Sequence, residues 1–233
     1  MFYDLHMHSC LSPCAEDEMT PTNIVNMALI KELDLIALTD HNSTKNLPGI
    51  AKAAERAGLR MLYGAELESS EEVHVLALYD DLEQALSLQP WLDEHLPFIP
   101  NDEHFFGKEE IRNENDELIG TENKLLIISL DQDLEECIEA IHATGGKAIL
   151  AHVLDRKNSI TNQLGFIPEG LPYDGLEVKS ELQRQQVLKS HPWIKEEETF
   201  WLIDSDAHQL IDISERVNSL PSAELRAMWR KLP

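Results

Sequence analysis

Basic residues are scarce in this chain of 233 residues. The 19 lysines and arginines stand against 43 aspartates and glutamates, which gives a formal net charge of −24. At long range, a chain so acidic is repelled by nucleic acid and by anionic membrane surfaces. We therefore expect no long nucleic acid as a partner, and a phosphate-bearing substrate would need a local positive centre, which bound metal ions can supply.

Long apolar runs, cysteines and aromatic residues are also few. No run of about 18 apolar residues occurs, so the sequence predicts no membrane span, and no apolar segment of the signal-peptide type follows the first residues. With only three cysteines, we expect reduced thiols and a cytoplasmic location. Aromatic residues make up 6% of the chain and are not interleaved with basic residues, so a base-stacking surface for nucleic acid is not indicated.

Three motifs of common enzyme classes are missing from the sequence. These are the phosphate-binding loop G-x-x-x-x-G-K-[ST], the dinucleotide fingerprint G-x-G-x-x-G and the nucleophile motif G-x-S-x-G. Kinase, dinucleotide-dependent and serine-hydrolase activities therefore have no motif to support them.

Short apolar runs alternate with helix-like stretches along most of the chain, which is typical of βα folds. Seven strands are predicted, over residues 2–6, 33–39, 60–65, 73–79, 147–151, 175–178 and 200–203. The polar, acidic segment at about 97–124 interrupts the pattern, and we interpret it as an inserted loop or small subdomain within one domain of residues 1–233. The expected fold class is α/β, a barrel of the TIM-like kind in which the chemistry lies where strands end.

Histidines and acids follow five of the seven predicted strands. His6 and His8 end the first strand, and because they are two residues apart they point to the same side and can reach one ion. Later strand ends carry the other candidates, which are Asp40, His41, Glu66, His152, Asp206 and His208. His74 lies near the start of the fourth strand instead, so that strand is expected to run differently. Buried acids without cations are costly, and the set therefore predicts a metal cluster at the C-terminal rim of the strands.

Five segments carry a resemblance to a known family. They read DLHMHSCLSP, LIALTDHNST, GAELESSEEVHVLAL, AILAHVLDRK and IDSDAHQL. In this order they resemble the motifs of the polymerase and histidinol phosphatase (PHP) family, from Phe2 to about Leu210. The resemblance implies a distorted (β/α)7 barrel with two or three divalent ions (Mn, Fe, Zn or Mg) at the rim, and hydrolysis of phosphate esters.

The resemblance also implies roles for single residues. The first ion would be held by His6, His8, Glu66 and Asp206. Glu66 would bridge to a second ion held by His74 and His152, and a third ion would lie between His41 and His208. Asp40 could ligate directly or orient a ligating imidazole.

The loop after the first strand departs from the usual short loop of the family. Four residues there could add a ligand to the third site, namely Cys14, Glu16, Asp17 and Glu18. We predict Asp17, because a carboxylate suits a Mn- or Mg-like site, whereas Cys14 would favour zinc. A structural zinc site made by Cys10, Cys14 and a histidine is a rival, but the second cysteine pair of an all-cysteine site is missing.

Basic side chains beside the predicted cluster are candidates for substrate binding. Arg156 and Lys157 follow the fifth strand next to His152, and the forked guanidinium donors of Arg156 suit a phosphate. Lys179, after the sixth strand, is a further candidate. His208 could also give a proton to the leaving group.

The predicted function is metal-dependent hydrolysis of a phosphate ester in a small phosphorylated substrate. A nucleotide, a short oligonucleotide end, or a sugar or amino-alcohol phosphate would each fit, with Glu66, Arg156, Asp206 and His208 as the catalytic group. One alternative is amidohydrolase-type hydrolysis, but such enzymes often use a carbamylated lysine where Glu66 stands here. Another is a non-catalytic metal-binding accessory module, which predicts missing ligands. The oligomeric state is not readable from the sequence.

Overall fold

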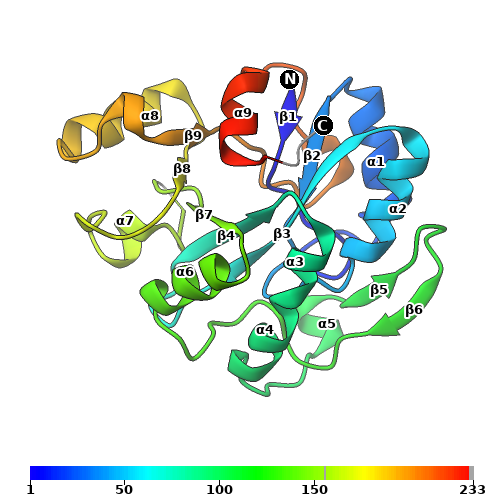
Figure 1. Cartoon of the computed structure of the whole chain (residues 1–233). Coiled ribbons are helices and arrows are strands. Elements are labelled where there is room, and N and C mark those ends of the chain that lie inside the picture. Colours follow the sequence, from blue (N-terminus) through cyan, green and yellow to red (C-terminus); the bar gives the residue numbers. More distant parts are fainter. Residues whose placement is uncertain (155, 231–233) are drawn as a thin grey trace.

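A curled sheet of seven strands organises the molecule, shown in Figure 1 as a computed structural model that describes residues 1–154 and 156–230. Its strand order is β1-β2-β3-β4-β7-β8-β9. The strands are β1 (Tyr3–Asp4), β2 (Leu35–Leu38), β3 (Arg60–Glu68), β4 (His74–Tyr79), β7 (Lys147–Leu150), β8 (Gly175–Glu177) and β9 (Phe200–Leu202). All seven predicted strands are present, and the predicted α/β class is confirmed.

The two edges of the sheet approach each other just beyond β1 and β9. Met7 forms an isolated parallel bridge with Ala207, and the amide of His8 donates to the carbonyl of Ala207 at 2.9 Å. The seven strands therefore form a distorted, TIM-like barrel that is closed by a few backbone contacts. These contacts bring the first and last ligand-bearing segments of the chain together.

Strand β4 runs against its neighbours. It pairs antiparallel with both β3 and β7, with Glu68 opposite His74, whereas the other neighbouring pairs are parallel. The start of β4 therefore lies at the rim where β3 ends. This confirms that the fourth strand runs differently and explains why His74 comes at the beginning of its strand.

The sheet has two apolar faces because side chains alternate along each strand. On β2, Leu35 and Ala37 belong to an inner cluster, whereas Ile36 and Leu38 face the helices. Helix α9 (Ser222–Met228) contributes Leu225 to the inner cluster. The interior of the barrel is therefore filled with apolar side chains, and polar chemistry is confined to the rim.

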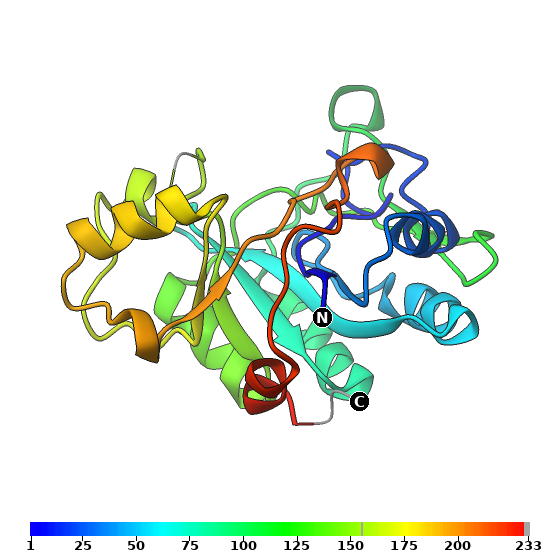
Figure 2. The ribbon, with the colours of Figure 1, turned by 90° about the horizontal axis from the view of Figure 1, so that it is seen from above.

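Helices cover the outer face of the sheet (Figures 1 and 2). They are α1 (Pro21–Ile30), α2 (Leu47–Ala57), α3 (Leu82–Ser87), α4 (Gln89–His95), α6 (Leu134–Ala143), α7 (Ile160–Gln163) and α8 (Glu181–Ser190). Local signals explain their ends: α6 begins at a capping box of Asp133 and Glu136, and α2 ends at Gly58, which has a φ of 70°. Within the described residues, no helix is long and apolar enough to cross a membrane.

The segment at 97–124 has secondary structure of its own. It contains α5 (Glu103–Phe106) and an antiparallel hairpin of β5 (Glu110–Arg112) and β6 (Leu118–Thr121). The amide of Glu110 donates to the carbonyl of Cys10 at 2.9 Å. A Cβ atom on Gly107, whose φ is 105°, would meet the carbonyl oxygen of Pro13 at 2.1 Å. The segment therefore packs closely against the loop that follows β1.

Candidate metal centre

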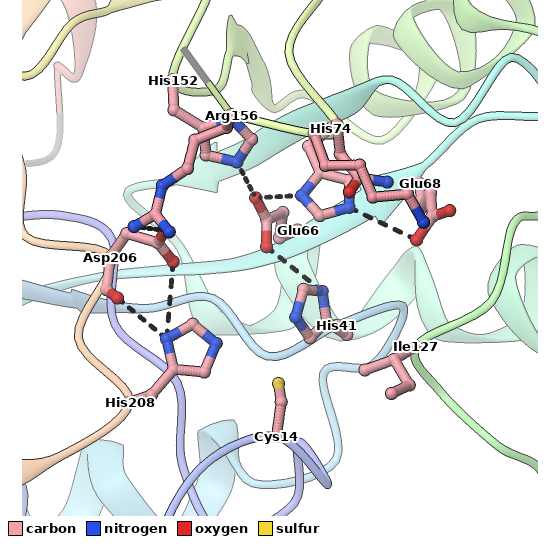
Figure 3. A pocket seen from close by; sticks show the side chains of 12 residues that line it. Cys14, His41, Glu66, Glu68, His74, Ile127, His152, Arg156, Asp206 and His208 are labelled. Carbon is pink, nitrogen blue, oxygen red and sulfur yellow. Dashed lines mark hydrogen bonds and ion pairs between the residues drawn. The ribbon is translucent and has the colours of Figure 1, made fainter. Parts of the chain in front are cut away.

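The carboxylate of Glu66 is the centre of the rim (Figure 3). Glu66 follows Leu62 and Gly64 on the inner face of β3, at the point where the apolar filling ends. Five imidazole nitrogens approach its two oxygens, those of His6 at 3.2 Å, His8 at 3.3 Å, His41 at 3.2 Å, His74 at 2.8 Å and His152 at 3.2 Å. All five residues are at most 8% exposed. Strands far apart in the sequence thus deliver five buried histidines to one carboxylate.

Asp206 is the second acid of the cluster. Its Oδ1 lies 3.5 Å from Nε2 of His6 and 3.4 Å from Nε2 of His8. Its Oδ2 accepts a charged contact from Arg156 at 2.9 Å. His208 donates from Nδ1 to the backbone carbonyl of Asp206 at 2.8 Å, which leaves its Nε2 available. Asp206 therefore connects the histidines to the basic side of the site.

The tautomer of His6 follows from its contact with Glu177. Nδ1 of His6 lies 2.9 Å from Oε2 of Glu177, a fully buried carboxylate that also accepts the amide of His152 at 3.1 Å. An ionised carboxylate can only accept, so the proton of His6 is on Nδ1. Nε2 of His6 is consequently the nitrogen that faces Glu66 and Asp206.

His8 is oriented in the same way through a serine. Nδ1 of His8 lies 3.2 Å from Oγ of Ser12, and this hydroxyl donates to Oδ1 of Asp40 at 2.8 Å. Because the serine proton goes to Asp40, Ser12 accepts the proton of Nδ1. Asp40 therefore orients a histidine indirectly, and its Oδ2 is held by the hydroxyl of Ser9 at 2.7 Å.

With Nδ1 of both rings held in this way, the two Nε2 atoms face each other and the carboxylates. Nε2 of His6 and of His8 are 3.3 Å apart, and both face carboxylate oxygens. In the described part of the chain, Nδ1 of His41 and Oε2 of Glu66 have no hydrogen-bond partner, although they are buried and 3.2 Å apart. Such an arrangement needs protons or metal ions between the nitrogens and the carboxylates; burial lowers the pKa of His6 and His8, but the nearby acids raise it more, so protons take this place when no metal ion is bound. The donor set therefore fits divalent metal ions.

Potential ligand atoms gather in three groups, each within 4.8 Å. The groups are His6, His8 and Asp206; His41, Glu66 and His74; and His8, His41 and His208. Neutral imidazole and carboxylate are common ligands of zinc, manganese and iron. The predicted ligands His6, His8, His41, Glu66, His74, Asp206 and His208 thus lie together, with His152 against Glu66.

The electrostatics of the cluster follow from burial and close charges. Burial alone would raise the pKa of Glu66, but the surrounding His74, His6 and His41 hold it well below its usual range. Burial lowers the pKa of His41, and the charge of His8 lowers it further. Burial and His8 also lower the pKa of His208 to about 4. Glu66 is therefore ionised and these two rings are neutral near pH 7, which is the state that metal ligands need.

Strained backbone accompanies the cluster. His152 has a φ of 28° and Asp206 a φ of 57°, in a region that residues with a side chain rarely adopt. Such conformations cost about 1–3 kcal/mol each and persist where the surroundings impose them. Both residues follow strand ends. The turns that direct their side chains inward therefore persist although their backbone conformation costs free energy.

A cavity of about 350 Å³ opens above the cluster. The described residues that line it are Cys14, His41, Glu66, Glu68, His74, Ile127, His152, Arg156, Lys157, Asn158, Asp206 and His208. Arg156 and Lys157 thus line the same cavity as His152. Lys179 is not in this lining, although burial and the charge of nearby Arg156 lower its pKa.

Two predicted ligands stand outside the cluster in the described structure. The carboxylate of Asp17 pairs with Nζ of Lys108 at 2.6 Å in an exposed ion pair, and Cys14 of the same loop lines the cavity instead. The oxygens of Asp40 are engaged by Ser9 and Ser12. Of the two roles considered for Asp40, the structure therefore favours orientation over ligation.

The sequence reasoning missed two acids that hold histidines. One is Glu177, which binds Nδ1 of His6. The other is Glu68, whose Oε2 lies 3.3 Å from Nε2 of His74 and whose Oε1 accepts the hydroxyl of Ser129 at 2.9 Å. A signal was available for Glu177, because it is the one charged residue of an otherwise apolar predicted strand at 175–178.

Part of this chain is similar in sequence to curated proteins. The 3′,5′-nucleoside bisphosphate phosphatase of Chromobacterium violaceum is 40% identical over 88 residues, which are 36% of this chain and 30% of that protein. The chain thus matches about a third of the length of that relative.

Two solved structures share the fold over most of this chain. A protein of Bifidobacterium adolescentis, assigned as a metal-dependent phosphoesterase, superposes with a TM-score of 0.63 at 20% identity and covers 97% of this chain and 94% of its own. The lesion-specific endonuclease PfuEndoQ of Pyrococcus furiosus has a TM-score of 0.61 at 18% identity, over 97% of this chain and 55% of its own. The sequence model of the PHP domain matches residues 4–164, and this chain therefore belongs to the PHP domain family.

Proposed function

We propose that this protein is a metal-dependent phosphoesterase that acts on small phosphorylated substrates. The observation that carries the proposal is the single carboxylate of Glu66 surrounded by five buried imidazoles at 2.8–3.3 Å. A structural metal site is closed by its ligands, whereas this cluster opens into a cavity of about 350 Å³, as a catalytic site must.

We assign the residues of the cluster to two or three divalent ions. His6, His8, Glu66 and Asp206 would hold the first, and Glu66, His74 and His152 the second. His41 and His208 would hold a third. When bound, such ions lower the pKa of water and neutralise phosphoryl oxygens.

Arg156 is proposed to position the phosphate. Asp206 holds one edge of its guanidinium at 2.9 Å, and 46% of its side chain stays exposed toward the cavity mouth. A guanidinium has five donors, so the others remain free for phosphoryl oxygens. Lys157 lines the same wall and adds positive charge to a chain that is otherwise strongly acidic.

His208 is proposed as a metal ligand more than as a proton donor. Its pKa of about 4 leaves the ring neutral at pH 7, and its Nδ1 proton is committed to the carbonyl of Asp206. The neutral Nε2 is then a lone-pair donor.

Two observations support a small substrate. The cavity volume is near the lower end of the usual range for ligand pockets, and the net charge of −24 opposes the approach of long polyanions. The similarity to a nucleoside bisphosphate phosphatase makes nucleotides the first class to test, and the fold shared with an endonuclease adds short oligonucleotide ends.

We also propose that residues 1–233 act as one domain in the cytoplasm, with residues 97–124 as an insertion. The free thiols of Cys10 and Cys137 are buried and Cys14 is exposed, a pattern that suits a reducing compartment.

The test is phosphate release by the purified, manganese-loaded protein. The panel would contain mononucleotides, 3′,5′-bisphosphates, short oligonucleotides and sugar phosphates. Glu66→Gln should lower kcat by at least about 10²-fold because it removes the charge that faces five histidines, while Glu94→Gln, an exposed acid of α4, should behave as wild type. Metal-loaded protein that is silent on the whole panel, or release that survives Glu66→Gln, would contradict the proposal.

A further inference from the structure

The three ligand groups of the centre differ in chemistry. Two of them include a carboxylate, Asp206 or Glu66, whereas the group of His8, His41 and His208 offers three imidazole nitrogens alone. His41 is 6% exposed, and its Nδ1 has no hydrogen-bond partner among the described residues. Because Nε2 of His8 is assigned to the first ion, His41 and His208 leave two positions of a four-coordinate third ion to be filled.

A thiol faces the open side of this three-histidine group. Cys14 lines the cavity together with His41 and His208, and Figure 3 shows its sulfur pointing toward the gap between their two rings. Among the described cavity-lining residues, none of the acids of the same loop is present, and Asp17 is held by Lys108 at 2.6 Å. Cys14 is therefore the residue of this loop that is directed at the histidines.

The backbone of the loop is held in this position from both sides. The amide of Glu16 donates to the carbonyl of His208 at 2.9 Å, which ties the loop to the strand end that carries a ligand. On the other side, Gly107 of the 97–124 segment leaves no room for a Cβ against Pro13, the neighbour of Cys14. Tertiary contacts therefore determine the direction of the thiol, because they hold the backbone of the loop in place.

We propose that Cys14 is a thiolate ligand of the third metal site and that this site selects zinc. The inference rests on the proposed metal cluster. His41, His208 and the Cys14 thiolate form a nitrogen–sulfur set with one position left for water or substrate, which suits zinc, whereas the carboxylate-containing groups also suit manganese or magnesium. On binding, the sulfur–hydrogen bond breaks, a sulfur–metal bond forms and the proton passes to water.

Cobalt(II) substitution tests this assignment without an activity measurement. The metal-free protein would be titrated with cobalt(II), and the near-ultraviolet thiolate-to-cobalt charge-transfer band would be recorded beside the visible ligand-field bands. The band should appear in wild type, disappear in Cys14→Ser and persist in Cys137→Ala, which removes a buried thiol of α6 outside the cluster. Cys14→Ser should also retain one zinc ion fewer per chain by elemental analysis.

The outcomes separate this inference from the proposed function. Ligand-field bands without a charge-transfer band, or a band that survives Cys14→Ser, would overturn the role of Cys14 and leave the cluster intact. Absence of any cobalt uptake would overturn both. Because Cys14 is an exposed residue, its serine variant should fold, and an unchanged melting temperature would show this.

Discussion

Replacing Glu177 with glutamine should weaken metal binding although Glu177 touches no metal in the proposed site. Its Oε2 accepts from Nδ1 of His6 at 2.9 Å and from the amide of His152 at 3.1 Å, and the side chain is fully buried. Glutamine keeps the shape but removes the charge that orients His6 and makes its Nε2 more basic. Loss of such a partner costs about 10–100-fold in metal affinity, or roughly 1.4–2.8 kcal/mol.

The assay is competition with a chelator for the metal, followed by kcat/KM for phosphate release. The metal affinity of Glu177→Gln should fall by this factor, and kcat/KM should fall with it at limiting metal and recover partly when metal is in excess. The matched control is Asp131→Asn, because Oδ1 of Asp131 makes an equally short contact of 2.8 Å with His95, but on the surface. The control should leave affinity and activity unchanged.

One result would refute this reasoning directly. If Glu177→Gln folds, as judged by its melting temperature, and binds metal within about twofold of wild type, then the carboxylate does not determine the orientation of His6. An equal loss in Asp131→Asn would show that the effect comes from lost charge in general and not from this contact.

Two further changes should have separate signatures. Arg156→Ala should raise KM for a phosphate ester about 10-fold or more at similar metal content, because a charge-assisted hydrogen bond contributes about 1.5–3 kcal/mol, and an unchanged KM would remove Arg156 from substrate binding. Burial, and then the charge of Glu122, raise the pKa of Glu109 to about 7 from a usual 4.5. The folded protein therefore holds a proton on Glu109 that the unfolded chain releases. As a result, the free energy of unfolding falls as the pH rises from about 5 to 8. Glu109→Gln should match wild type at pH 5 and be more stable by about 2 kcal/mol at pH 8, after allowance for screening; parallel urea-denaturation profiles across this range would contradict it.

The sequence by itself determined the strands and the candidate ligands at their ends. Both depend on local pattern: apolar runs mark the seven strands, and the two-residue spacing of His6 and His8 places both rings on one side of an extended chain. The unusual position of His74 even indicated the reversed strand. These features can be predicted without knowledge of distant contacts, because the parallel strands of a barrel end at a common rim.

Only the tertiary structure decided which other groups reach that rim. Glu177 meets His6 across 171 positions of the chain, and Ser12 connects His8 to Asp40 through side chains that no periodicity reveals. The sequence also left open which of Asp17 and Cys14 is directed at the histidines. This depends on how the 97–124 segment packs against Pro13 and on the ion pair between Lys108 and the carboxylate of Asp17. Strand ends follow from short-range pattern, whereas loop direction and hydrogen-bond partners follow from long-range packing, which a single sequence does not encode in readable form.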